Sequence, residues 1–127
     1  MVTLRNSIFI TCLLYSCADS AQPGHNVVIN NQIEGCFTLS NWQLDLSKEP
    51  VLLHVTVGSG KENRECPCKS ALFKYTVTQK DGPDYDTLLI GTFTTLNKNT
   101  LLLPLAVQKQ LVFTNVPINI SLSCSRP

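Results

Sequence analysis

The stretch SALFKYTVTQKDGPDYDTLLIGTFTTL, Ser70 to Leu96, carries the strongest structural signal in the chain. Its first part alternates between apolar and polar side chains, and the apolar phase is Ala71, Phe73, Tyr75 and Val77. A period of two is that of a β-strand with one buried face. The turn-forming run KDGPDYD follows, and apolar residues resume after it. The segment therefore predicts two strands joined as a hairpin.

The same alternation extends in both directions from this hairpin. Val51 to Val57 alternates before it, and Ile118, Ile120, Leu122 and Cys124 share one phase at the end of the chain. Clusters of Gly, Pro, Asn and Asp separate these segments, and none of them has the period and capping residues of an amphipathic helix. About seven short strands in one chain predict an all-β protein, an antiparallel immunoglobulin-like β-sandwich. A small barrel is the alternative.

The first residues, MVTLRNSIFITCLLYSCADSAQP, have the layout of a secretory signal peptide. One basic residue precedes a mostly apolar run that is shorter than the roughly 20 residues needed to span a bilayer. We therefore expect residues 1–21 to be a signal peptide and residues 22–127 to form a single β-sandwich domain, located in the periplasm or secreted. Leu14 to Cys17 also resembles a lipoprotein cleavage site, which makes Cys17 a lipidation candidate. In that case the protein is anchored to a membrane.

Charge and motifs exclude several classes of function. Ten basic and nine acidic residues nearly balance and form no basic stripe, so a nucleic-acid partner is not expected. The chain has no recognisable pairing of a nucleophile with a base, and we expect neither an enzyme nor a cofactor. Structural zinc uses two close pairs of ligands. Only one close cysteine pair exists here, and the two histidines lie far from it in sequence, so no metal site is predicted.

Four cysteines follow the predicted signal peptide, and four cysteines permit three connectivities. An exported protein meets an oxidising compartment, so we expect disulfides. Extending the strand pattern backwards places Cys66 and Cys68 on the outward phase, whereas Cys124 is inward; the phase of Cys36 is ambiguous. The preferred arrangement is a structural Cys36–Cys124 disulfide and a local Cys66–Cys68 pair. The two crossed pairings together carry equal weight.

A Cys-x-Cys disulfide is cramped, and strained, exposed disulfides are easily reduced. Cys66 and Cys68 are therefore candidates for a redox pair. The alternative, that both are ordinary structural cysteines, stays open.

Three segments carry a resemblance to known proteins: ECPCKSALFKYTV, LLLPLAVQKQL and VPINISLSC. Together they resemble a family of small exported bacterial proteins without assigned function. More distantly, the chain is similar to the curli assembly protein CsgC, a periplasmic immunoglobulin-like sandwich that restrains amyloid subunit assembly. That similarity implies a functional role only for Cys66 and Cys68. Cys36 and Cys124 depart from the CsgC pattern.

These observations lead to a functional expectation. We expect an exported, non-enzymatic β-sandwich that binds another exported protein, as a chaperone-like module for a β-rich client. The edge strands of a sandwich are natural docking sites for an extended peptide. The alternative is a thiol–disulfide redox protein that uses Cys66 and Cys68. A third reading is a purely structural lipoprotein acylated at Cys17.

Overall fold

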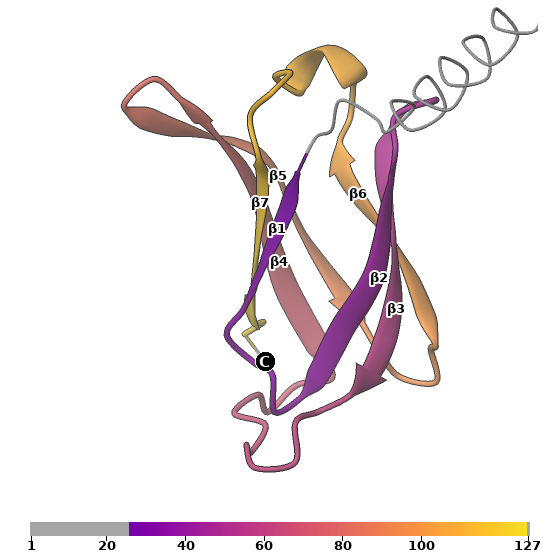
Figure 1. The fold of residues 1–127 in the computed structure, drawn as a ribbon. Helices are drawn as coiled ribbons and strands as arrows, with labels where there is room; N and C mark the ends of the chain where they lie inside the picture. The colour runs from indigo at the N-terminus through magenta and orange to yellow at the C-terminus, as the bar shows by residue number, and fades with distance from the viewer. Residues whose placement is uncertain (1–25, 127) are drawn as a thin grey trace, which may run out of the picture.

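The computed structural model describes residues 26–126 (Figure 1). The predicted signal peptide, residues 1–21, and the lipidation candidate Cys17 lie outside the described residues. The elements, in chain order, are β1 (Val27–Asn31), β2 (Phe37–Asp45), β3 (Val51–Ser59), β4 (Leu72–Asp81), β5 (Asp84–Thr94), β6 (Thr100–Ala106), the 3-10 helix η1 (Lys109–Leu111) and β7 (Ile118–Cys124).

The strands form two sheets, in the orders β1-β7-β4-β5 and β2-β3-β6. The prediction of an all-β sandwich of seven strands is confirmed. One pair departs from the expected antiparallel arrangement, because β1 runs parallel to β7, with Val27 opposite Ile118 and Asn31 opposite Leu122. The other strand pairs in both sheets are antiparallel.

Strand β1 occupies a special place in this topology. In an immunoglobulin-like sandwich, strands A, B and E are neighbours in one sheet, and strands C, F and G in the other. If β2 is taken as strand A, then β2-β3-β6 and β4-β7 match A-B-E and C-F. The place beside β7 that belongs to the last strand, G, is filled by the N-terminal β1, in parallel orientation.

The core follows from the alternation that the sequence shows. In β4, Phe73, Tyr75 and Val77 are buried, whereas Leu72 and Lys74 are exposed. The core continues through Ile33 in the turn after β1 and through the inward residues of the other strands: Phe37, Val51, Leu53, Val55, Phe93, Leu101, Leu103, Leu105, Ala106, Ile118, Ile120 and Leu122.

Four aromatic rings lie between the two sheets. The ring centroids of Phe37, Phe73 and Phe93 lie 4.7–5.7 Å apart, and Tyr75 lies 5.9 Å from Phe93. Phe37 belongs to the three-stranded sheet and the other three rings to the four-stranded sheet, so this cluster joins the two layers.

The end of the sandwich near η1 depends on one buried polar side chain. Gln79, on β4, is fully buried. Its Nε2 donates to the carbonyls of Phe113 and Val116 at 3.1 and 3.0 Å, and its Oε1 accepts from the Phe113 N–H at 2.8 Å. A buried amide needs such partners to offset its lost hydration. Gln79 thus fixes the connection from β6 to β7, at the top of Figure 1.

Candidate functional site

The four described cysteines form two disulfides, Cys36–Cys66 and Cys68–Cys124, with Cα–Cα distances of 4.4 and 5.2 Å. The expected local Cys66–Cys68 pair and Cys36–Cys124 disulfide are therefore wrong; one of the crossed pairings is present. The physical reason is that β4 begins only at Leu72. The cysteines precede it in an irregular loop, so the strand phase does not extend back to them.

This loop, residues 60–71, is tied to both sheets at the bottom of Figure 1. Cys66 joins it to Cys36, which directly precedes β2, and Cys68 joins it to Cys124, the last residue of β7. The Sγ atoms of Cys36, Cys66 and Cys68 all lie within 4.8 Å of one another. Metals bind thiolates, and these sulfurs are already engaged in S–S bonds. The arrangement is therefore that of two adjacent disulfides.

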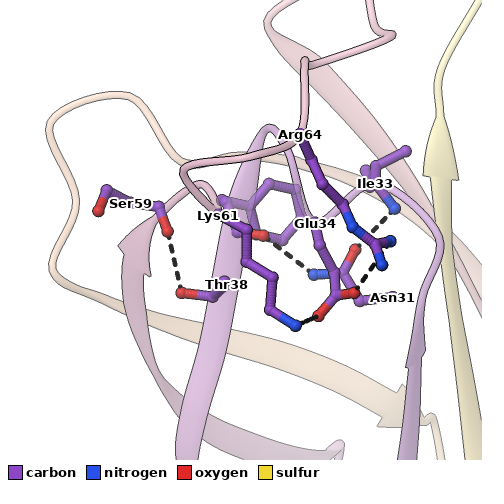
Figure 2. A network of polar contacts seen from close by, with 8 residues as sticks. Asn31, Ile33, Glu34, Thr38, Ser59, Lys61 and Arg64 are labelled. Atoms are coloured by element: carbon purple, nitrogen blue, oxygen red, sulfur yellow. Dashed lines mark hydrogen bonds and ion pairs between the residues drawn. The ribbon is translucent and has the colours of Figure 1, made fainter.

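A hydrogen-bonded turn connects β1 to β2 beside the disulfides. The Asn31 side chain accepts from the Ile33 N–H at 2.9 Å and donates to the Phe37 carbonyl at 3.0 Å (Figure 2). Thr38 Oγ1 donates to the Ser59 carbonyl at 3.1 Å, which adds a side-chain contact between β2 and β3. The Asn31 bonds hold the ends of β1 and β2 together, and the Thr38 bond ties β2 to β3 at the same end of the sandwich.

Glu34 lies in the same turn and faces two cations of the disulfide-bonded loop. Its carboxylate lies 3.2 Å from Lys61 Nζ and 3.5 Å from Arg64 Nη1 (Figure 2). Both basic side chains are more than half exposed, so the pairs contribute little to stability. Their effect is local, because the negative charge of Glu34 is compensated by two neighbouring cations and the three groups together carry one positive charge.

Beginning at this turn, β1 and β2 border a groove of about 320 Å³. Its lining is mostly uncharged: Ile29, Asn30, Asn31, Glu34, Thr38, Leu39 and Trp42. Trp42 is the single tryptophan of the chain and is 41% exposed. It lies at a bulge of β2, where the register shifts between Ser40 and Gln43 and Asn41 adopts a φ of 51°. The bulge explains why Trp42 leaves the regular alternation of the strand.

No strand among residues 26–126 pairs with the outer edge of β1, and this open edge borders the groove. The Asn26 carbonyl accepts from the Ile118 N–H at 2.8 Å, so Asn26 directs its polar groups toward β7. The N–H and C=O of one strand residue point to the same side, and the side alternates along the strand. Val28 and Asn30 therefore bond to β7, while Val27 and Ile29 direct their N–H and C=O groups away from it.

The opposite side of the sandwich, between β5 and β6, is closed. The Tyr75 hydroxyl donates to the Pro104 carbonyl on β6 at 2.8 Å. Gly91 on β5 makes room for this ring, because a Cβ at Gly91 would lie 2.6 Å from Tyr75 Cε1. Pro104 has no N–H to offer a further strand.

Sequence reasoning and structure agree only in part on the site. The structure brings three of the four described cysteines into one cluster, but it gives Cys66 and Cys68 different partners. The groove and Trp42 were missed. The available signal was the Asn41–Trp42 pair, since Asn tolerates a positive φ and a tryptophan outside the apolar alternation indicates a bulge.

The two disulfides indicate a non-cytoplasmic protein. Among residues 26–126, no helix has the length and apolar character needed to cross a membrane.

A protein-family model matches most of the chain. Residues 11–127 fit the model of a family described as "Uncharacterized protein conserved in bacteria (DUF2195)". Neither a curated protein nor a solved structure matches the chain. The distant similarity to CsgC is not among the matches and stays an expectation. The match covers the whole sandwich, including both disulfides and the groove, and the chain therefore belongs to this bacterial family.

Proposed function

We propose that the protein is an exported, non-enzymatic binding module, periplasmic or secreted, that holds an extended segment of a β-rich client protein. The observation that supports this proposal is the open edge of β1, which faces Leu39 and Trp42 across the groove. An extended segment can pair with such an edge through its main chain and place alternate side chains into the groove. Holding an aggregation-prone strand in this way is a chaperone-like activity.

The lining of the groove indicates the chemistry of the segment. Ile29, Leu39 and Trp42 supply apolar surface, and Asn30, Asn31 and Thr38 supply neutral polar groups. The Glu34 carboxylate is paired with Lys61 and Arg64, so the groove offers no uncompensated negative charge to a basic ligand. The volume is at the lower end of the 300–1,000 Å³ range of ligand pockets. The best fit is a short, uncharged segment rich in β-branched residues.

Trp42 supplies the readout for a binding experiment. The probe is an end-blocked eight-residue peptide of alternating Val and Thr, titrated into the protein while Trp42 emission is recorded. Burial of the indole shifts its emission to shorter wavelength, so we expect a saturable blue shift. The control peptide has the same sequence with N-methyl groups on alternate amides, which removes the donors that strand pairing needs. An equal response to both peptides, or no response, would contradict the proposal.

A matched pair of variants separates the edge of β1 from its side chains. Ile29→Pro removes the N–H that we place on the open edge, while Ile29→Ala keeps it and removes most of the side chain. We expect binding to be lost in Ile29→Pro and only weakened in Ile29→Ala. Circular dichroism and the unfolding midpoint establish that both variants fold. Binding that survives in Ile29→Pro would show that the peptide does not pair with β1.

A second candidate function is thiol–disulfide exchange with client proteins, favoured by the solvent exposure of Cys66. The test is the reduction of insulin by dithiothreitol, followed by turbidity, with wild-type protein and Cys66→Ser. Acceleration by the wild type alone would support this function. Equal rates with and without the protein would contradict it.

A further inference from the structure

The cysteine cluster has a geometry that two independent structural disulfides do not require. The Sγ atoms of Cys36, Cys66 and Cys68 lie within 4.8 Å of one another, although Cys68 belongs to a different disulfide from the other two. Cys66 is exposed, while Cys36 and Cys68 are partly buried. A solvent thiol therefore meets Cys66 first, and the sulfur bonded to it has another disulfide within short reach.

Backbone contacts hold the segments that carry these cysteines together, in addition to the S–S bonds. The Lys61 N–H donates to the Glu34 carbonyl at 2.8 Å, which joins the loop to the turn before Cys36. A Cβ on Gly35 would collide with the backbone of Glu65, so the two segments lie in direct contact. If the Cys36–Cys66 bond opens, these contacts keep Cys36 close to Cys68.

We propose that Cys66 is a site of modification by a low-molecular-weight thiol, and that the sulfur it releases opens the second disulfide. A thiolate attacks Cys66 Sγ, forms a mixed disulfide with it and displaces the Cys36 thiolate. The Cys36 thiolate then attacks Cys68 Sγ, forms a Cys36–Cys68 disulfide and displaces the Cys124 thiolate. Two disulfides and one thiol are present before and after, and the proton of the incoming thiol ends on Cys124. This inference does not depend on the binding function.

The exchange has a definite product because Cys124 does not belong to the cluster. The Cys124 sulfur is bonded to Cys68, but it does not belong to the group of mutually close sulfurs formed by Cys36, Cys66 and Cys68. Attack by Cys36 on Cys68 therefore forms Cys36–Cys68, and a Cys36–Cys124 bond is not expected in the folded chain. The released Cys124 ends β7, the strand on which β1 depends.

The variant Cys66→Ser tests the second step without any added thiol. It leaves Cys36 as a free thiol within 4.8 Å of the Cys68 sulfur. We incubate the folded variant at pH 8, quench it with acid, alkylate it and map its disulfides by mass spectrometry. The expected result is a mixture of Cys68–Cys124 and Cys36–Cys68, with alkylation shared between Cys36 and Cys124. A sample kept at pH 4, where thiols are protonated, controls for exchange during handling.

Two results would overturn the proposal. One is that only Cys68–Cys124 is found after equilibration. The other is that Cys36–Cys124 appears as readily as Cys36–Cys68, because this pairing signals exchange through the unfolded chain.

Wild-type protein incubated with reduced glutathione gives an independent test of the first step. We expect glutathione on Cys66 and alkylation at Cys124. Glutathione found chiefly on Cys124 would contradict entry at Cys66.

Discussion

The two long sides of the sandwich differ in how their edge strands are joined. Between β5 and β6, the Tyr75 ring crosses Gly91 and its hydroxyl reaches the Pro104 carbonyl. Between β1 and β2, no side chain of the described residues makes such a bond beyond the Asn31 contact at the closed end, and a groove remains with Trp42 on its wall. One side is sealed by a side chain, and the other is open.

The difference shows how a small β-protein controls which edge of its sheets can pair with an additional strand. A proline on β6, a bulge in β5 and the acidic start of β5 are common means of discouraging strand pairing at an edge. Strand β1, with the sequence VVINN, has no proline, no charge and no bulge. A partner strand therefore finds a more receptive edge on β1 than on β5 or β6, and the following variants test how each side is maintained.

The largest expected effect comes from the aromatic cluster that supports both sides. Phe73 is 6% exposed and packs against Phe37 on β2 and Phe93 on β5. Phe73→Ala should lower the free energy of unfolding by about 3–5 kcal/mol, because it leaves a cavity between the layers. Lys74→Ala, on the exposed phase of the same strand, should be nearly silent. Equal denaturation midpoints would show that the strand phase is wrong.

The next effect concerns the support of the open side. Replacing both Cys68 and Cys124 with serine removes a disulfide that spans 56 residues. Loss of this constraint on the unfolded chain should cost about 2–4 kcal/mol. Because Cys124 ends β7, we also expect faster amide exchange at Val28 and Asn30 of β1, measured by hydrogen–deuterium exchange. Acceleration confined to β5 and β6 would contradict the assignment of this disulfide to the β1 side.

A smaller effect is expected at the connection between β6 and β7. Gln79→Ala leaves the Phe113 N–H and the carbonyls of Phe113 and Val116 without their side-chain partner, at about 1–3 kcal/mol. Urea unfolding measures the loss of unfolding free energy, and hydrogen exchange of the Phe113 amide shows whether the β6–β7 connection is the part that is loosened. The matched control is Lys80→Ala, an exposed neighbour that should change neither quantity. An unchanged exchange rate at Phe113 would disprove the role of Gln79.

The smallest effect is expected for the hydrogen bond that closes the side between β5 and β6. Tyr75→Phe removes the hydrogen bond to Pro104 and should cost about 0.5–1.5 kcal/mol at neutral pH.

The same residue gives a pH dependence. Burial raises the pKa of Tyr75 above its ordinary value of 10.0, so the unfolded chain loses this proton first. The stability linked to Tyr75 is complete below pH 10 and falls as pH rises above it. The wild type should therefore lose its advantage over Tyr75→Phe in alkaline solution, as measured by denaturant unfolding from pH 8 to 11. A constant difference across this range would contradict the burial of the hydroxyl.

Much of the fold could be predicted because one-sided burial leaves a period of two in the sequence. Phe73, Tyr75 and Val77 are buried as their phase predicts, and Ile118, Ile120 and Leu122, which share one phase at the end of the chain, are buried together. The parallel pairing of β1 with β7 could not be predicted in this way. Alternation identifies a strand and its faces, but contains no information on which neighbour it joins or in which direction.

The disulfides show where the same reasoning fails. The alternation of β4 does not continue from Phe73 back to Cys68 and Cys66, because the residues before Leu72 form a loop. In a loop the side-chain direction depends on local turns, and the contacts of Gly35 and Gly60 with facing backbone determine the path here. Such contacts join distant parts of the chain, and the only feature of the sequence that indicates them is the glycine itself. The groove at Trp42 was missed for a related reason, because a bulge interrupts the alternation.

The most direct test of the account compares the two sides in one experiment. Backbone amide resonances are assigned by NMR, and the alternating Val/Thr peptide is added to the folded protein. The account predicts chemical-shift changes and slowed amide exchange at Val27, Ile29 and the Trp42 bulge, with little change along β5 and β6. Changes concentrated on β5 and β6, with β1 unaffected, would contradict the claim that the open edge of β1 is the docking site.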